Sequence, residues 1–175
     1  MKCPICKLNK SKRVCLLTTS CICNKCCGTS RQKETCHPCG YYREPKRDYK
    51  KIPFYRPDEM NGHGYRQSIA HVIEETITTF DYEMHNIIRD DVPIRIIEQL
   101  LDIYYFSEQH KISENELLEK GFQSVLQAIN DELSNVPREE LVKILGAIYF
   151  VANRRTTGQR EYLSLIRKYI GVAII

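Results

Sequence analysis

The residues best suited to chemistry in this sequence are its nine cysteines, which all fall within the first 39 of 175 positions. Six of them form three C-x-x-C pairs: Cys3 and Cys6, Cys23 and Cys26, Cys36 and Cys39. Two residues between thiolates let the backbone turn tightly, so that both sulfurs reach one metal ion, and Zn²⁺ takes four such ligands in a closed structural site. Three pairs supply six ligands, and two closed sites therefore need two more from Cys15, Cys21 and Cys27.

Whether these cysteines bind metal or form disulfides depends on the redox environment of the protein. The first ten residues contain no apolar segment of a secretory signal, and no uncharged apolar run reaches the roughly 18 residues that cross a bilayer. We therefore expect a cytoplasmic, reducing environment and no membrane partner, which favours metal binding over disulfides. Free buried thiols are disfavoured because the segment has too few aliphatic residues to bury them. A thioredoxin-like redox pair is disfavoured because no βαβ pattern surrounds any pair. An iron–sulfur cluster uses the same ligands and remains the chemical alternative.

The cysteine spacing is similar to that of known protein families. Its start resembles a cross-braced RING-type finger, but the adjacent Cys26 and Cys27 depart from that pattern, so a ubiquitin-ligase function is not indicated. The motifs CPxC, CxxCCG and a final CxY more closely resemble uncharacterised bacterial cysteine-rich proteins with a C-terminal helical region. A G-x-R-x-Y-L-x-x-I stretch from Gly158 to Ile166 also matches these proteins. The spacing and this resemblance together imply two Zn²⁺ per chain, with eight ligands: Cys3, Cys6, Cys15, Cys23, Cys26, Cys27, Cys36 and Cys39. Cys21 is then the spare thiol, unless it or His37 replaces one of the eight.

Charge divides the chain into a basic and an acidic part. Residues 1–57 carry 14 Lys and Arg against 3 acidic residues, formally +11, and about +7 once eight thiolates hold two Zn²⁺. Residues 58–175 carry 12 basic and 19 acidic residues, formally −7. Such asymmetry indicates an acidic partner, either a nucleic acid or the protein's own acidic part.

Basic residues alternate with aromatic ones directly after the last cysteine pair. Aromatic rings that stack on bases, with Lys and Arg that meet phosphates, are typical of single-stranded nucleic-acid surfaces. The candidate contacts are Tyr41, Tyr42, Arg43, Lys46, Arg47, Lys50, Lys51 and Tyr55. The same rings could instead attach an extended connector to the helical part of the chain, and both interpretations stay open.

The remainder of the chain has helical periodicity. Apolar residues recur at steps of three and four, and Pro93, Pro137 and a capping-box pattern at Ser113 mark helix starts. The spacing predicts five helices, beginning near Tyr65, Asp91, Ser113, Asn135 and Thr157. We therefore expect a mainly α fold with three parts: a cysteine module at 1–42, a basic aromatic connector at 43–64 and a five-helix bundle at 65–175.

The helical part shows no pattern of an active site. His71 and Glu75 share a helix face, but a di-iron bundle needs Glu-x-x-His pairs on two helices, and none occurs there. No phosphate-binding glycine loop and no nucleophile elbow is present. Basic residues gather near the C-terminal end, where they complement helix dipoles or extend the basic surface: Arg154, Arg155, Arg160, Arg167 and Lys168. We predict a non-enzymatic, zinc-dependent nucleic-acid-binding or regulatory protein. The alternative is an adaptor whose bundle binds a protein partner or a second copy, with zinc purely structural.

Overall fold

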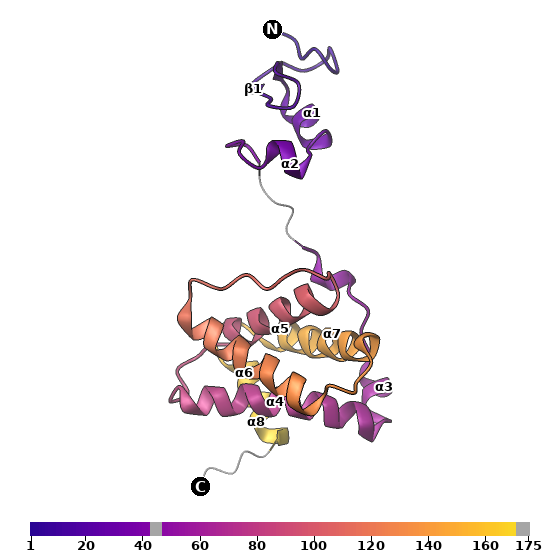
Figure 1. Ribbon diagram of the computed structural model, residues 1–175, viewed down its shortest axis with the longest axis vertical. Coiled ribbons are helices and arrows are strands. Elements are labelled where there is room, and N and C mark those ends of the chain that lie inside the picture. Colours follow the sequence, from indigo (N-terminus) through magenta and orange to yellow (C-terminus); the bar gives the residue numbers. More distant parts are fainter. Residues whose placement is uncertain (43–46, 171–175) are drawn as a thin grey trace. The chain divides into compact units, whose positions relative to one another are not determined.

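A computed structural model describes residues 1–42 and 47–170 of the protein, apart from the side chain of Lys33. The chain divides into two compact units, Met1–Arg47 and Asp48–Ile175 (Figure 1). The second unit thus begins inside the segment predicted as a connector. Arg43 and Lys46, two of the predicted nucleic-acid contacts, lie outside the described residues.

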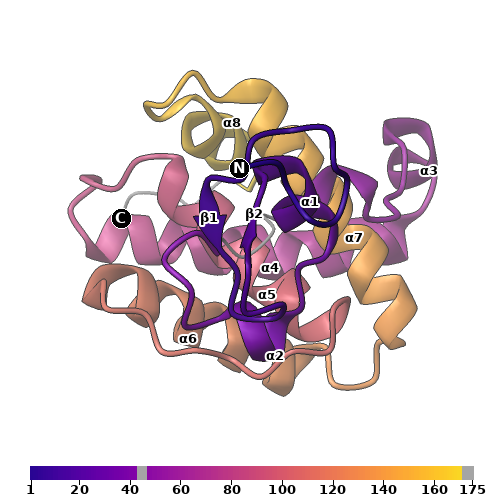
Figure 2. The same cartoon turned by 90° about the horizontal axis from the view of Figure 1, so that it is seen from above.

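The first unit is small and contains little regular structure. Its strands β1 (Arg13–Val14) and β2 (Cys21–Ile22) form an antiparallel pair with Arg13 opposite Ile22 (Figure 2). Two short helices follow, α1 (Asn24–Thr29) and α2 (Lys33–Cys36). The buried residues of this unit form one cluster: Cys3, Cys15, Ile22, Cys23 and Cys26. Four of these five are cysteines, so the core of the unit consists mainly of thiol groups.

The second unit confirms the prediction of a mainly helical fold. Five long helices occupy the five predicted regions: α4 (Gly64–Glu83), α5 (Asp91–Tyr104), α6 (Glu116–Glu132), α7 (Arg138–Arg155) and α8 (Glu161–Ile170). Helix α4 packs against α6, α7 and α8, while α5 packs against α6 and α7 (Figure 1). Their apolar faces enclose a single core that includes Ile77, Phe80, Leu100, Phe122 and Ile144.

In none of the helices of the described residues does an apolar stretch reach the length that a membrane crossing requires.

Aromatic residues attach the start of the second unit to its long helices. This segment contains a 3₁₀ helix, η1 (Tyr49–Lys51), and a short helix, α3 (Pro57–Asn61). The Tyr49 hydroxyl donates to Asp102 Oδ1 at 2.8 Å, and the Phe54 ring stacks on Phe150 with centroids 4.8 Å apart. For residues 49–55, the structure therefore has the rings packed on the helices, which is the second of the two interpretations of this segment.

Three acidic side chains tie α8 to the rest of the bundle. Buried Asp90 accepts hydrogen bonds from the backbone N–H groups of Tyr162 and Leu163, at 2.9 and 3.0 Å, at the start of α8. Buried Asp81 accepts from both Arg160 and Arg167, with closest distances of 2.7 Å. Two of the arginines from the predicted basic group are therefore bound to a carboxylate inside the same unit.

The third of these acidic side chains, Glu74 on α4, accepts a hydrogen bond from the buried Tyr162 hydroxyl at 3.0 Å.

Candidate metal centre

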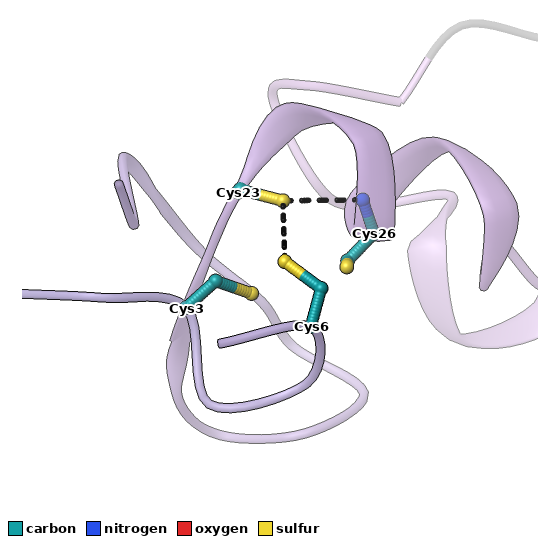
Figure 3. Close-up of side chains that lie close together, drawn as sticks. All are labelled: Cys3, Cys6, Cys23 and Cys26. Atoms are coloured by element: carbon teal, nitrogen blue, oxygen red, sulfur yellow. Dashed lines mark hydrogen bonds between the residues drawn. The ribbon is translucent and has the colours of Figure 1, made fainter. Parts of the chain in front are cut away.

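Four thiols of the first unit converge on one point. The sulfur atoms of Cys3, Cys6, Cys23 and Cys26 all lie within 4.8 Å of one another, and the Cys6 and Cys23 sulfurs are 3.8 Å apart (Figure 3). Zinc–sulfur bonds of about 2.3 Å in a tetrahedron place the sulfurs about 3.8 Å apart. The spacing therefore fits one metal ion between the four sulfurs.

The first pair of ligands sits on a tight turn. The Lys7 N–H donates to the Cys3 carbonyl at 2.8 Å, and the Cys3 N–H donates to the Asn9 carbonyl at 2.8 Å. Lys7 adopts a left-handed conformation with φ of 55°. This turn brings Cys3 and Cys6 to the same side of the loop (Figure 3).

The second pair sits at the start of helix α1. Cys23 is its N-cap residue, and its sulfur accepts a hydrogen bond from the Cys26 N–H at 3.4 Å. The side-chain amide of Asn9 lies 3.8 Å from the Cys6 sulfur and 3.9 Å from the Cys23 sulfur. A helix N-terminus and amide donors both stabilise negative sulfur, which is the form that binds metal.

The pKa values of Cys6 and Cys26 are shifted in opposite directions. Backbone N–H groups of Asn9 and Leu8 lower the pKa of Cys6 to about 6. Burial raises the pKa of Cys26 to about 12, and its hydrogen bonds with Cys23 and Cys6 add to this effect. Burial opposes ionisation of Cys3, but backbone N–H groups of Cys6 and Cys23 lower its pKa overall. Without a cation, the burial of Cys26 therefore opposes full ionisation of the cluster, whereas a divalent cation compensates two of its four negative charges.

The cluster has the character of a structural site. Cys3, Cys23 and Cys26 are at most 8% exposed, so little space remains for a substrate or an open coordination position. Four thiolates are soft ligands that suit Zn²⁺ or iron. A cluster of several irons would hold the sulfurs further apart than one ion does, so the spacing favours a single ion.

The other four predicted ligands lie elsewhere in the same unit. Cys15, Cys27, Cys36 and Cys39 all line one small hollow of about 10 Å³. Among the residues that the structure describes, only the first group brings its sulfurs to within 4.8 Å of one another. Cys21 lies on β2, opposite Val14, and belongs neither to that group nor to the lining of the hollow.

The predicted nucleic-acid contacts differ in their exposure. Tyr41 is 48% exposed, Lys50 and Lys51 are exposed, and Tyr42 and Arg47 are half-buried. The guanidinium of Arg13 lies 4.8 Å from the centre of the Tyr41 ring.

Tyr55, in contrast, is 9% exposed, and its hydroxyl donates to Glu140 at 2.6 Å. A buried ring has no free face for a base, and Arg66 covers it at 3.7 Å.

A basic hollow beside the cluster of four thiols was not predicted. Lys10, Lys12 and Lys25 line it together with Asn9, Asn24 and Cys23. All three lysines are exposed. They come from both sides of the β1–β2 hairpin, so only the fold brings them together. In the sequence, the only indication of this hollow is the high density of lysine in the first 25 residues.

Comparisons of the chain with protein-family models, with curated protein sequences and with solved structures gave no match.

Proposed function

We propose that the protein is a non-enzymatic zinc protein whose first unit is folded around zinc and binds nucleic acid. The observation that carries this proposal is the convergence of Cys3, Cys6, Cys23 and Cys26 at distances that suit one tetrahedral ion. The proposal includes a second zinc ion, because eight candidate thiolates supply two tetrahedral sets.

Zinc in this unit has a structural role. Ile22 is the one aliphatic residue of its buried cluster, and the described part of the unit has no other fully covered aliphatic side chain. So small an apolar core offsets little of the conformational entropy lost on folding. Metal–thiolate bonds supply the remainder, so that the free energy of metal binding becomes free energy of folding.

The nucleic-acid part of the proposal rests on charge and exposure. Residues 1–47 carry 11 basic and 2 acidic residues, and the unit stays positive by about +5 with two tetrathiolate zinc sites. Lys10, Lys12 and Lys25 surround one hollow of about 420 Å³, which suits phosphate groups. Exposed Tyr41 supplies a ring for stacking on a base.

The proposed interface consists of the three lysines of the hollow and most of the segment predicted from sequence. Within the first unit it retains Tyr41, Tyr42 and Arg47, whereas Tyr55 is left out because it is buried. Arg43 and Lys46, which lie outside the described residues, and Lys50 and Lys51, which belong to the second unit, stay contacts predicted from the sequence.

Salt dependence tests this function. The zinc-loaded full chain should bind a single-stranded oligonucleotide, and log K should fall with log salt by about 0.7 for each phosphate contact. Replacing Lys10, Lys12 and Lys25 together by Gln should reduce that slope by about 2. A matched variant with Lys111, Lys120 and Lys168 replaced by Gln removes equal charge from exposed sites of the second unit, and its slope should not change. Absence of salt-sensitive binding by the zinc-loaded protein would exclude the function.

An adaptor is the second candidate, and one observation favours it. The helical unit has an apolar groove of about 290 Å³ between α3, α4, α7 and α8, lined among others by Met60, Ala147, Phe150 and Tyr169. A protein helix with an apolar face would fit such a groove. Capture of one protein partner that persists at high salt, without oligonucleotide binding, would favour the adaptor.

A further inference from the structure

The hollow lined by four cysteines in the first unit points to a second metal site with a defined ligand set. We infer that Cys15, Cys27, Cys36 and Cys39 bind the second zinc ion, so that the two sites interleave along the chain. This inference rests on the proposal that the first unit is a zinc module, and it specifies which thiolates share the second ion.

The four cysteines reach the hollow from three separate segments. Cys15 directly follows β1, Cys27 lies on α1, and Cys36 ends α2 with Cys39 in the turn after it. A volume of about 10 Å³ is too small for an organic ligand and is about that of one water-sized sphere. The hollow thus combines four soft ligands with space for one ion.

Adjacent cysteines on α1 separate the two sites. Successive residues of a helix project about 100° apart. Cys26 accordingly points into the first cluster, whereas Cys27 lines the second hollow. One helix therefore supplies a ligand to each site, which explains why two cysteines stand side by side in this sequence.

Backbone contacts prepare the last pair of ligands for a metal. The Cys39 N–H donates to the Cys36 carbonyl at 2.9 Å, and the Tyr42 N–H donates to the Cys39 carbonyl at 2.8 Å. Cys36 and Cys39 therefore lie on a tight turn with two residues between them, like Cys3 and Cys6 in the first site. In addition, Arg13 Nη1 donates a hydrogen bond to the Cys27 sulfur at 3.8 Å.

The described part of the segment that carries Cys36 and Cys39 contributes no buried side chain to a core. From Gly28 to Tyr42, no described side chain is fully buried, and the buried cluster of the unit includes no residue after Cys26. A metal bound to Cys36 and Cys39 would crosslink this segment to Cys15 and Cys27. Because the four sulfurs are less closely spaced than those of the first site, binding must draw the segment inward, and this ordering costs affinity.

Occupancy of the second site would also fix part of the proposed nucleic-acid interface. Arg31 and Tyr41 line the hollow, and Arg31 donates to the Tyr41 carbonyl at 3.3 Å. The guanidinium of Arg13 lies 4.8 Å from the centre of the Tyr41 ring. The exposed Tyr41 ring is two residues from Cys39, so a metal at Cys39 restrains it directly.

Metal counting on the full chain tests the ligand set. Native mass spectrometry after loading with Zn²⁺ should give two ions for the wild type and for Cys21→Ser, the matched control. Cys36→Ser and Cys39→Ser should each give one ion. During titration with Co²⁺, the wild type should show two successive steps of thiolate absorption, and Cys36→Ser should keep only the tighter step. In hydrogen exchange, the second equivalent of Zn²⁺ should protect residues 31–42.

Each outcome supports or overturns the inference. A wild type that binds one ion, or a Cys36→Ser variant that still binds two, would overturn it. A loss of one ion in Cys21→Ser would replace the proposed ligand set by one that contains Cys21. Failure of the zinc module itself is distinguishable, because the wild type would then bind no zinc at all.

Discussion

Glu74 provides a direct test of the electrostatics inside the helical unit. It lies on α4 and lines the apolar groove, and one of its oxygens accepts the hydrogen bond from Tyr162. Burial raises its pKa from an ordinary value of 4.5 to about 7, although the hydrogen bond from Tyr162 acts in the opposite direction. The carboxyl group is therefore neutral in the folded protein over a range of pH in which it is ionised in the unfolded chain.

The sign of the effect on stability follows from proton binding. Between about pH 4.5 and pH 7, the folded state binds more protons at this site than the unfolded state, so the free energy of unfolding falls as pH rises. The full shift corresponds to about 3 kcal/mol, at 1.36 kcal/mol for each pKa unit. Since the side chain keeps partial access to water at the groove, we expect a contribution of about 1 to 3 kcal/mol.

Glu74→Gln removes this penalty and keeps an oxygen that accepts from Tyr162. The variant should be more stable than the wild type by about 1 to 3 kcal/mol at pH 8, and the difference should disappear near pH 4.5. Urea unfolding followed by circular dichroism at both pH values measures it. Glu83→Gln changes an exposed residue of the same helix and should leave stability within about 0.5 kcal/mol at either pH. A Glu74→Gln variant that is no more stable at pH 8, or equally stabilised at both pH values, would refute the reasoning.

Three further predictions concern other parts of the molecule. Asp81→Asn deprives two arginines of their buried carboxylate and should lower the free energy of unfolding, measured in urea, by about 3 to 5 kcal/mol. Asp131→Asn, on the exposed side of α6, should lower it by less than about 0.5 kcal/mol. A decrease below about 1 kcal/mol for Asp81→Asn would contradict a stabilising role of the contacts from Asp81 to Arg160 and Arg167. Gly146→Ala places a Cβ 2.7 Å from the Pro53 carbonyl oxygen, so its Tm should fall despite a gain of about 1 kcal/mol in helix propensity. As the control, Gly64→Ala adds a Cβ that meets no atom within 4 Å and should not lower the Tm. An unchanged Tm in Gly146→Ala would show that the attachment of residues 52–55 does not depend on their close approach to Gly146. If the first unit binds zinc as proposed, a chelator should abolish amide protection in residues 1–42 and leave the melting of the helical unit unchanged. Protection that survives chelation would argue against metal-dependent folding.

The positions of the long helices could be predicted because their apolar residues repeat locally. The five predicted starts fall within about four residues of the observed ones, and the largest difference is at α8. There the Thr157 hydroxyl donates to Glu161 at 2.5 Å and holds the preceding residues in a turn, with Gly158 at φ of 97°. The short helix α3 was missed, although the sequence has a local signal for it in Pro57 at its first position and in Glu59 two residues later. The Glu59 side chain accepts a hydrogen bond from the Arg56 N–H.

Contacts between distant residues could not be predicted from local patterns. The attachment of Tyr49 to Asp102 and of Tyr55 to Glu140 joins residues 53 and 85 positions apart, and sequence alone left two interpretations of these rings open. The same limit applies to the cysteines. Spacing marked candidate ligands, but only the fold could bring Cys3 and Cys6 together with Cys23 and Cys26.

The polar attachment of α8 has a consequence for the uniqueness of the fold. An apolar helix face repeats about every turn, so a helix held only by such a face could slide by about 5.4 Å and bury similar residues again. The anchors of α8 do not repeat. Asp90 receives the first N–H groups of the helix, and Asp81 receives two arginines that are seven residues apart. A shift by one turn would leave both carboxylates buried without partners, which is a much larger penalty than any change in apolar contact. The buried carboxylates therefore select one axial position for α8 among those that its apolar face would accept.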